Sequence, residues 1–309
     1  MKAFIFGILA AFFFSFTFIL NRTMELEGGS WLWSTALRFV FMLPILATVL
    51  AVRGGLRHSL RHLLAHKKAY LLWSTVGFGL FYAPLTFASV FSPGWLVAGS
   101  WQITIIAGTL LIPFLSSADG VRHHIPWRQL RWSLLILFGV VMMLWEQAVS
   151  ASLYQVLLGL LPVVFAAFMY PLGNRQMMFV CQDDVDTLQR VFNMTLASQP
   201  FWLLIMLWGY WDHGLPSAGQ MTQSFLVALF AGVIATVLFF AATQLVRRDM
   251  KKMATVEATQ SGEVIFTLLG ETLILGMLMP NPLALGGIAL IVMGIVAQSA
   301  LPLLEGKRR

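Results

Sequence analysis

The repeat unit of this chain is visible in two apolar stretches, FGILAAFFFSFTFILNRTM at residues 6–24 and LGLLPVVFAAFMYPLGNRQM at residues 158–177. The matching positions are Gly7 with Gly159, and Asn21-Arg22 with Asn174-Arg175 after one insertion. Each stretch is close to the roughly 20 residues that an α-helix needs to cross the hydrocarbon core of a bilayer. The two stretches therefore indicate membrane-spanning helices that begin two related halves of the chain.

The correspondence continues outward from these stretches in the same order along both halves. STALRF at 34–39 aligns with DTLQRV at 186–191, and FYA at 81–83 aligns with FFA at 239–241. The last match sets Thr104 opposite Glu263. Each half holds five apolar segments, and because five is odd, the second half must enter from the opposite face of the membrane. The sequence thus predicts an inverted-topology repeat, an architecture of secondary transporters that bind substrate near the bilayer midplane.

The predicted fold is an all-α integral membrane protein with ten transmembrane helices in two inverted five-helix repeats, residues 1–150 and 151–309. The expected spans are 3–20, 31–52, 70–91, 94–115, 131–149, 153–173, 186–210, 222–246, 253–276 and 281–304. Extracytoplasmic connections such as FSPG at 91–94 are very short, so the helices that they join are expected to be antiparallel neighbours.

Positive charge alternates between the loops that join these segments. Of the 20 Lys and Arg residues, 18 fall on one side: Lys2, Arg53, Arg57, Arg61, Lys67, Lys68, Arg122, Arg128, Arg131, Arg175, Arg190, Arg247, Arg248, Lys251, Lys252, Lys307, Arg308 and Arg309. The opposite loops hold only Arg22, and Arg38 lies within an apolar segment. Because short loops rich in Lys and Arg stay cytoplasmic, we expect both termini to be cytoplasmic in a bacterial-type inner membrane.

The composition excludes several classes of protein. The chain of 309 residues is 59% hydrophobic and 11% charged, whereas soluble domains are about 45–50% apolar and about 25% charged. Ten spans of roughly 20 residues leave little room for a soluble enzyme or receptor domain. The net charge of +7 sits in loops that flank spans, where it sets topology and meets anionic lipid, so a nucleic-acid partner is not expected. The single Cys181 rules out an intrachain disulfide.

At this point the chain resembles the drug/metabolite transporter superfamily with two EamA-like five-helix repeats. The residues that carry the resemblance are the start FxxSFTFILNR, the Arg38-Phe39 pair, the paired ends LILFGVVMML and GGIALIVMGIVAQ, and SGEVIFTLLGETLILG in the ninth segment. Within the superfamily it is similar to the multidrug resistance efflux branch. The small four-helix members carry their membrane glutamate in the first helix, whereas here the intramembrane acids lie in the ninth segment. The resemblance implies a transporter fold more specifically than it implies a substrate.

Glu263 is the strongest candidate for ion coupling. It lies about ten residues into the ninth segment, hence roughly 15 Å along the helix at 1.5 Å per residue. A carboxylate near the bilayer centre costs at least about 2.5 kcal/mol, so such a residue usually faces a cavity and marks a functional site. An apolar environment favours the protonated form, which suits a group that exchanges a proton for a cation. The alternative is a neutral carboxyl group hydrogen-bonded to a neighbouring helix.

Arg38 and Glu271 lie at comparable depths toward the extracytoplasmic side. Glu271 is two turns beyond Glu263, and Arg38 is about seven residues from the outer end of the second segment. Because a lone buried charge is far more costly than a paired one, we expect a structural ion pair between them, with a gating or substrate role as the alternative. Arg190 has Asp186 one helical turn earlier and is expected to pair with it locally.

Aromatic and amide side chains inside the spans supply the candidates for substrate contact. Rings around a cavity attract organic cations through contacts worth roughly 0.5–2 kcal/mol each, although most rings in helix bundles only pack. The candidates are Tyr82, Trp101 and Tyr170, with Gln102, Asn193 and Gln260 as hydrogen-bonding partners.

Metal and cofactor chemistry is not expected. His58, His62 and His66 share one helical face, and HxxxH spacing can bind zinc, but they lie in the most basic loop. An amphipathic helix on anionic headgroups explains that pattern better, and the loop pair His123-His124 is equally weak. No ATP-binding loop, nucleophile elbow, dinucleotide fingerprint or paired CxxC motif is present in the sequence, so an enzyme is not expected.

The sequence therefore predicts a proton-coupled exporter of organic cations or small amphiphilic compounds that works by alternating access. Its partners would be a small-molecule substrate, protons and the lipid bilayer, in a monomer or homodimer without nucleic acid or cofactor. The main alternative is a narrow-specificity transporter of amino acids, nucleosides or choline-like solutes on the same fold. A remote alternative is an intramembrane enzyme or a membrane receptor.

Overall fold

The structure is a computed structural model that describes residues 2–114, 125, 127–182, 184–246, 256 and 259–305. Within these residues all regular elements are helices. Several residues used in the sequence analysis lie outside the described residues: Arg122, His123, His124, Arg247, Arg248, Lys251, Lys252, Lys307, Arg308 and Arg309.

The helices follow one another with short connections. In the first half they are α1 (Lys2–Leu26), α2 (Trp31–Val52), α3 (Leu56–Ala65), α4 (Lys67–Ser74), η1 (Thr75–Gly79), α5 (Leu80–Phe91), α6 (Gly94–Trp101), α7 (Ile103–Leu110), η2 (Ile112–Phe114), α8 (Trp127–Leu130) and α9 (Ser133–Ser150). In the second half they are α10 (Leu153–Cys181), α11 (Thr187–Ala197), α12 (Gln199–His213), α13 (Ala218–Val227), η3 (Ala228–Ala235), α14 (Thr236–Leu245), η4 (Thr259–Ser261), α16 (Gly262–Ile274) and α17 (Pro282–Glu305). Here η1 and η3 are π-helical, and η2 and η4 are 3-10 turns.

Five helical segments are long and apolar enough to cross a membrane: Lys2–Leu26, Trp31–Val52, Lys67–Phe91, Leu153–Cys181 and Ala218–Thr243. A sixth is the pair α11 and α12, which bends by 44°. Ser133–Val149 and Pro282–Ala297 are shorter apolar helices. The prediction of an all-α, multi-pass membrane protein is confirmed at this level.

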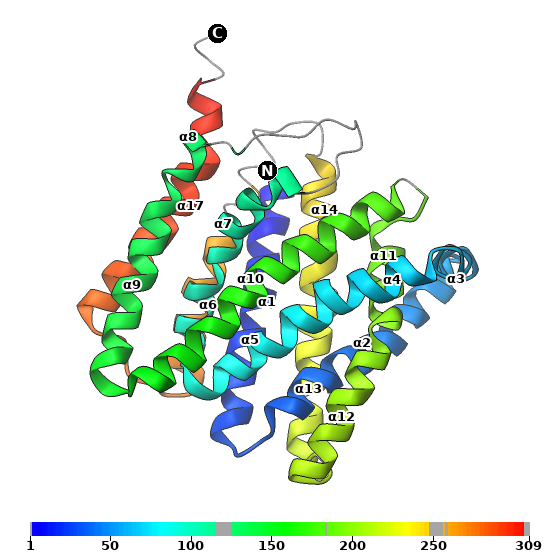
Figure 1. Cartoon of the computed structure of the whole chain (residues 1–309), viewed down its shortest axis with the longest axis horizontal. Helices are drawn as coiled ribbons and strands as arrows, with labels where there is room; N and C mark the ends of the chain where they lie inside the picture. Colours follow the sequence, from blue (N-terminus) through cyan, green and yellow to red (C-terminus); the bar gives the residue numbers. More distant parts are fainter. Residues whose placement is uncertain are drawn as a thin grey trace.

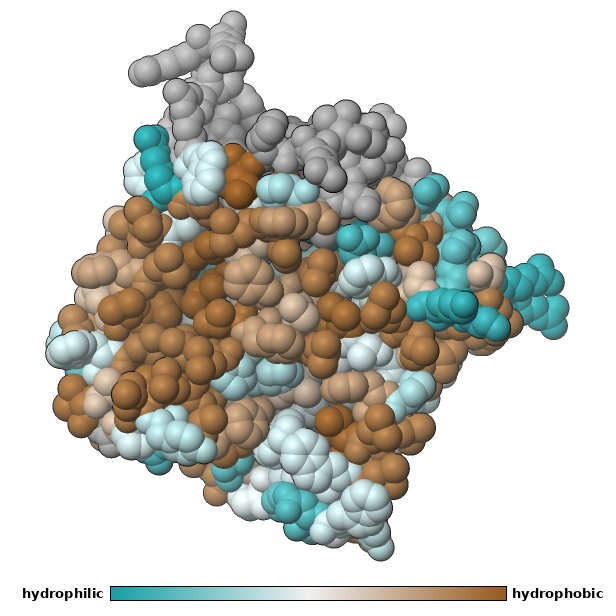
Figure 2. Space-filling view, viewed as in Figure 1, coloured by the Kyte–Doolittle hydropathy of each residue, from teal (hydrophilic) through white to brown (hydrophobic). Residues whose placement is uncertain are grey.

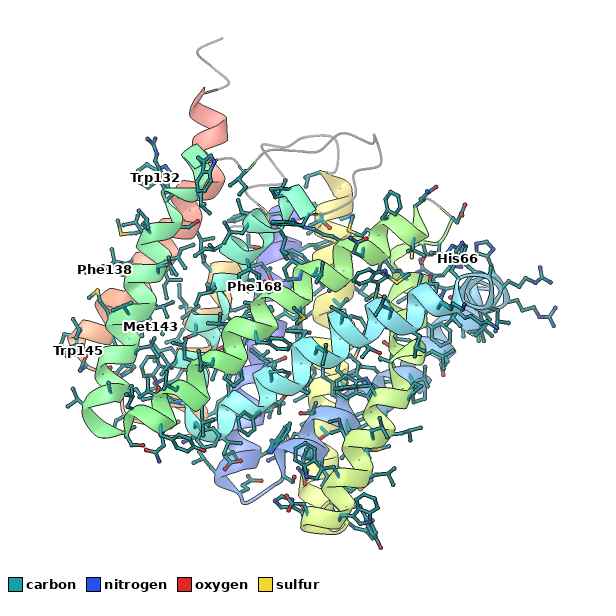
Figure 3. All side chains as sticks on the ribbon, in the orientation of Figure 1. His66, Trp132, Phe138, Met143, Trp145 and Phe168 are labelled. Atoms are coloured by element: carbon teal, nitrogen blue, oxygen red, sulfur yellow. The ribbon has the colours of Figure 1, made fainter. Side chains whose placement is uncertain are left out.

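The outer surface of the bundle is apolar, as a lipid-facing surface must be. The face in Figure 2 is hydrophobic across its middle, and hydrophilic residues gather at the right, over α3, and along the lower edge. Large exposed side chains such as Leu161 and Phe165 on α10 and Leu204 on α12 cover this surface. On α9, Phe138 and Trp145 point outward and Met143 points into the bundle (Figure 3).

The last helix of each half packs against its counterpart. In Figure 1, α9 and α17 lie side by side along the left of the molecule, and α5 and α10 run side by side diagonally across its middle. A Cβ atom on Gly287 would lie 2.6 Å from the carbonyl oxygen of Gly139, so the two backbones touch at these glycines. Small residues permit such close helix packing in membranes, and this explains the glycines in the paired ends LILFGVVMML and GGIALIVMGIVAQ.

The first and last helices that the structure describes begin and end, respectively, on one side of the bundle in Figure 1. The start of α1 and the C-terminal part of α17 are at the top, whereas the end of α1 and the hairpin between α12 and α13 are at the bottom. Helix α3, at the right, lies between α2 and α4 in the chain and packs against α11.

Besides the bent pair α11 and α12, two segments that the sequence predicted as continuous spans are interrupted. The segment predicted at 94–115 is divided into α6 and α7 at Gln102, whose side-chain amide donates to the carbonyl of Ala98 at 3.2 Å. In the segment predicted at 253–276, the 3-10 turn η4 precedes α16, and Glu263 is the second residue of that helix. Interrupted helices expose backbone and polar groups inside a membrane, and transporters use them to form binding sites.

Candidate functional site

Glu263 occupies the first turn of α16, where the helix dipole favours an acidic side chain. The residue is 5% exposed. Its carboxyl group has no hydrogen-bond or ion-pair partner in the part of the chain that the structure describes. Gln260, one turn earlier in η4, has a buried Nε2 that also lacks a partner. A buried carboxyl group without a structural partner is the kind of group that binds an ion or a substrate.

An aromatic cluster joins three helices of the bundle. Phe81 lies at the centre, with ring centroids 5.0 Å from Trp101 and 4.8 Å from Tyr170. The rings of Trp101 and Tyr170 are 5.5 Å apart and meet edge to face. The structure therefore brings two of the predicted aromatic residues together. It also adds Phe81, which sequence reasoning missed although it directly precedes Tyr82.

Tyr82 belongs to a neighbouring group and already has a cationic partner. The guanidinium carbon of Arg38 lies 4.1 Å from the centroid of the Tyr82 ring. The hydroxyl of Tyr82 accepts from Asn21 Nδ2 at 3.2 Å, and the residue is fully buried. The Tyr82 ring therefore makes a cation–π contact with Arg38. The sequence suggested instead that this ring would contact the substrate.

Arg38 is buried, with 7% of its surface exposed. Its Nη1 donates to Thr17 Oγ1 at 3.3 Å, and its Nε has no partner. Arg190, the corresponding residue of the second half, has its guanidinium carbon 5.0 Å from the Phe240 ring. Asp186, which the sequence suggested as a partner of Arg190, caps α11 through the backbone N–H of Gln189 at 2.8 Å.

Tyr170 experiences the charges of three residues of the bundle. Its hydroxyl lies within electrostatic range of Glu263, Arg190 and Arg38. Tyr170 therefore links the aromatic cluster to one unpartnered acid and two arginines. We define the central site as Glu263, Arg38, Tyr170, Trp101 and Phe81.

Glu271 binds backbone rather than Arg38. Its Oε1 accepts from Gly94 N at 2.7 Å and its Oε2 accepts from Trp95 N at 2.9 Å. Glu271 of α16 therefore caps the first turn of α6. A side chain at position 94 would lie 2.8 Å from Glu271 Oε1, so the approach requires glycine.

The expected Arg38–Glu271 ion pair is not among the contacts of the described residues, where ion pairs join His62 to Asp184 and His213 to Asp212. The physical reason is that the free N–H groups at a helix start satisfy a carboxylate as well as a cation does.

Asn193 lies in a polar network beneath α3 instead of in the central site. Its Nδ2 donates to the Ser59 carbonyl at 2.9 Å and to the Tyr70 hydroxyl at 3.1 Å, while Ser59 Oγ donates to Asn193 Oδ1 at 2.8 Å. The Tyr70 hydroxyl also meets His62 Nδ1 at 3.0 Å and Cys181 Sγ at 3.3 Å. We call Ser59, His62, Tyr70, Cys181 and Asn193 the α3 network.

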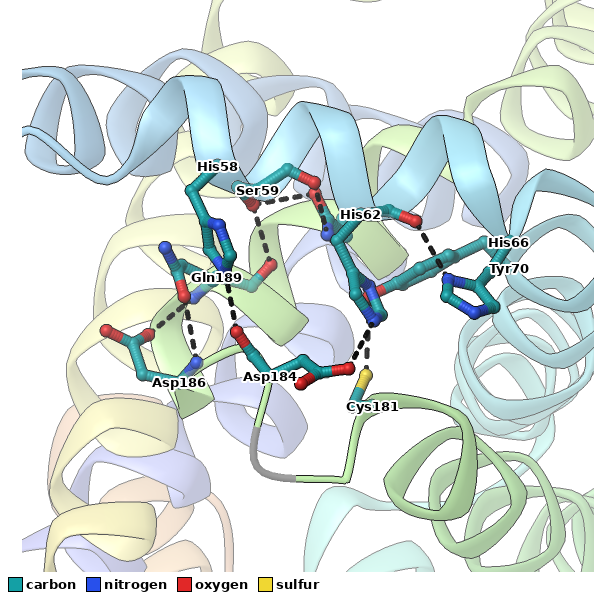
Figure 4. Close-up of polar contacts among 10 residues, drawn as sticks. His58, Ser59, His62, His66, Tyr70, Cys181, Asp184, Asp186 and Gln189 are labelled. Atoms are coloured by element: carbon teal, nitrogen blue, oxygen red, sulfur yellow. Dashed lines mark hydrogen bonds and ion pairs between the residues drawn. The ribbon is translucent and has the colours of Figure 1, made fainter.

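The α3 network fastens an amphipathic helix to the junction between α10 and α11. In Figure 4, side chains of α3 point toward Cys181, Asp184 and Gln189. His58 Nε2 lies 2.6 Å from the carbonyl of Asp184, and His62 Nε2 lies 4.0 Å from its carboxylate. Burial, and next the neighbouring His66, lower the pKa of His62 below its usual value. Among the described residues no cluster of His, Cys, Asp or Glu has the geometry of a metal site.

The side chain of Gln102 bonds within its own helix, whereas the sequence suggested a hydrogen bond to the substrate. It is 2% exposed, and its side chain donates to the carbonyl of Ala98 within its own helix. Thr104, the counterpart of Glu263, donates to the carbonyl of Ala167 at 3.2 Å. These two side chains therefore stabilise the interruption between α6 and α7.

Comparison with known proteins identifies the family of this chain. Residues 1–302 match the model of the EmrE family, described as "Putative multidrug resistance efflux transporter". The chain is 50% identical over 303 residues to a Bacillus subtilis (strain 168) protein named uncharacterized protein YjlA, covering 96% of this chain and 94% of that protein. It is 48% identical over 267 residues to an uncharacterized 42.1 kDa protein of Shouchella clausii, covering 85% and 70%.

A solved crystal structure with 14% sequence identity superposes with a TM-score of 0.64 over 97% of each chain, which shows the fold alone. The whole-length family match and the close relatives settle the family, in agreement with the resemblance noted in the sequence. This chain belongs to the EmrE family of multidrug-resistance-type efflux transporters within the drug/metabolite transporter superfamily.

Proposed function

We propose that this protein exports organic cations or small amphiphilic compounds in exchange for protons, by alternating access across a bacterial inner membrane. The observation that carries the proposal is Glu263, a buried intramembrane carboxyl group without a partner among the described residues, at the start of an interrupted helix. A proton and a cationic substrate would compete for this carboxylate.

The proposal includes ten spans in two inverted repeats, residues 1–150 and 151–309, and the helix packing supports it. The first helix of each half packs against the third span of the other half, as α1 with α14 and α10 with α5. It also packs against the fourth span of the other half, as α1 with α16 and α10 with α7. Equivalent helices of the two halves thus pack against equivalent helices of the other half, as expected if one half is a rotated copy of the other.

Contacts between individual residues repeat in the same way. A Cβ atom on Gly7 would collide with the hydroxyl of Thr259, and one on Gly159 would collide with the hydroxyl of Ser92. These glycines are equivalent in the two repeats, and each one meets the fourth span of the other half, although Thr259 aligns with Ser100 and not with Ser92. The stacking of Arg38 on Tyr82 and of Arg190 on Phe240 is a second repeated pair.

In the proposed cycle, Glu263 takes up a proton while the site faces outward and releases it inward as the substrate ammonium group binds. The aromatic cluster supplies an apolar and cation-attracting wall with loose shape selection. The contact of Glu271 with Gly94 and Trp95 holds α16 against α6 and closes the extracytoplasmic side. The α3 network closes the cytoplasmic side.

A second candidate is a transporter of a narrow class of metabolites on the same fold. The observation that favours it is the buried guanidinium group of Arg38, which a purely cationic substrate would not approach. The family is one of transporters, so an intramembrane enzyme has no support from the relatives.

The test uses proteoliposomes with an imposed pH gradient and a fluorescent organic cation. Glu263→Gln keeps the size and hydrogen-bonding capacity of a protonated glutamate but cannot release a proton, so proton-coupled transport should be lost while the protein remains folded. Glu146→Gln is the control, because Glu146 is a half-buried carboxylate near the end of α9. Wild-type coupling in Glu263→Gln would show that Glu263 is a packing residue and would overturn the proposal.

A further inference from the structure

Helix α3 and its two ends carry exposed cations for which the described part of the chain supplies no counter-charge. Among the described residues, none of these cations makes an ion pair or a side-chain hydrogen bond. They are Arg53, Arg57, Arg61, Lys67 and Lys68. The sequence around them is free of acids, since it holds no Asp or Glu between Glu27 and Asp119. Because like charges repel one another, such a surface favours an anionic partner.

The basic and the buried side chains occupy opposite faces of α3. Arg57, Arg61 and Leu64 are spaced i, i+4 and i+7, so they share one exposed face, which we call the arginine face. Ser59 and His62 lie on the reverse face, where they are buried in the α3 network. The histidine spacing indicated a helix on headgroups, but His62 points toward the protein (Figure 4). A partner can therefore bind the arginine face without breaking the contacts that hold α3 on the bundle.

The position of α3 is that of a helix on a membrane surface. In Figure 1, α3 is seen nearly end-on, whereas α5 and α10 are seen along their length, so α3 lies across the direction of the spans. Exposed apolar side chains surround it: Val52 ends α2, Leu71 follows on α4, and Leu64 lies on the arginine face itself. The hydrophilic residues over α3 thus border the hydrophobic surface of the bundle (Figure 2). Cations beside exposed leucine, on a helix parallel to the membrane, are typical of helices that bind anionic lipid.

We propose that the arginine face of α3 docks on anionic phospholipid of the cytoplasmic leaflet. The guanidinium groups of Arg57 and Arg61 donate to headgroup phosphates, and Leu64 enters the boundary between headgroups and acyl chains. Lys67 and Lys68, at the start of α4, add to the positive charge. The negative surface potential of an anionic leaflet attracts such basic segments over about one Debye length, whereas a zwitterionic lipid surface carries no net charge. Docking of this kind is independent of the transported solute.

The test titrates lipid into the purified full-length protein in neutral detergent micelles and follows the melting temperature. Anionic phosphatidylglycerol is compared with zwitterionic phosphatidylcholine, because a lipid that binds the native protein raises its melting temperature. We expect phosphatidylglycerol to give the larger rise. In the double variant Arg57→Gln/Arg61→Gln, the half-saturating amount of phosphatidylglycerol should increase on the order of thirty-fold, which corresponds to about five-fold for each cation at an anionic surface. Arg57→Lys/Arg61→Lys should keep most of the wild-type response, because it keeps both charges.

Lys2→Gln/Arg131→Gln is the matched control and should respond as wild type does. It removes two exposed cations that lie away from α3, at the start of α1 and just before α9. Equal rises with both lipids in wild type would overturn the proposal, and this comparison needs no variant to fold. A loss in the control as large as in Arg57→Gln/Arg61→Gln would also overturn it, since the lipid would then respond to net charge alone.

Two further outcomes bear on the nature of the partner. If Arg57→Lys/Arg61→Lys loses as much of the response as Arg57→Gln/Arg61→Gln, the arginines act through packing and the charge-based docking is refuted. Inorganic phosphate, added at the same phosphate concentration, should leave the melting temperature unchanged, because it offers neither a charged surface nor an acyl boundary for Leu64. A rise as large as that with phosphatidylglycerol would indicate a site for free phosphate and would refute docking on the leaflet.

Discussion

Replacement of Glu271 should separate α16 from α6 and lower the free energy of unfolding. The Glu271 carboxylate is 1% exposed and accepts from two backbone N–H groups, Gly94 at 2.7 Å and Trp95 at 2.9 Å. Hydrogen bonds to a charged group contribute about 1.5–3 kcal/mol each. In Glu271→Gln, the amide oxygen still accepts one N–H, but the NH₂ group faces the other N–H and cannot accept from it.

The expected loss for Glu271→Gln is therefore one charge-assisted bond, about 1.5–3 kcal/mol, and Glu271→Ala should lose both, about 3–6 kcal/mol. Equilibrium unfolding in mixed detergent micelles, followed by tryptophan fluorescence, measures both values. Glu146→Gln is the control, because Glu146 Oε1 accepts a single backbone N–H, that of Asn281 at 3.0 Å, and its other oxygen has no partner. We expect this control to lose about 1 kcal/mol or less, since the contact is exposed. A loss in Glu271→Gln no greater than in Glu146→Gln would refute the capping role.

Three further outcomes are expected. The losses of unfolding free energy caused by Arg38→Leu and Glu271→Leu should add within about 0.5 kcal/mol in the double variant, because the two residues share no partner. A larger coupling energy would show that Arg38 and Glu271 do interact. The pKa of His62 is lowered in the folded protein, so the unfolded chain binds more protons than the native one as the pH falls. The stability that neutral His62 contributes is therefore complete above pH about 6.5 and is lost as pH falls through the lowered pKa. The melting temperature should therefore fall less steeply below pH 6.5 in His62→Gln than in wild type; parallel curves would contradict this. Reporter fusions after Gly54 and after His213 should lie on opposite faces of the membrane, and a cytoplasmic signal at both would contradict the ten-span topology.

The all-helical, multi-pass character of the protein could be predicted because each long helix appears in the sequence as a run of apolar residues. The interruptions were missed for a physical reason. A span broken at Gln102 has the same composition as a continuous one, and the break depends on a side chain that bonds its own backbone. The amphipathic helix α3 was predicted from its histidine spacing, but its attachment through Asn193 was not. The sequence places Asn193 within an apolar segment without showing which neighbour it contacts.

The sequence proposes Trp101, Tyr82 and Tyr170 as substrate contacts, but it does not show which of these rings contact one another. In the structure the rings of Trp101 and Tyr170 meet, whereas the ring of Tyr82 contacts Arg38. The sequence pairs Glu271 with Arg38 because it displays charged side chains but not the free backbone N–H groups at the start of α6, which bind Glu271 in the structure.

Cys181 gives this protein a chemical reporter that needs no engineering. It is the single cysteine of the chain, it is 2% exposed, and its Sγ lies within the α3 network at 3.3 Å from the Tyr70 hydroxyl. A thiol-reactive dye can reach it only when the network separates, so the labelling rate reports how often that opening occurs. Unmodified protein could therefore be labelled with and without a candidate substrate, and the change in rate would measure how binding at the central site alters opening beneath α3.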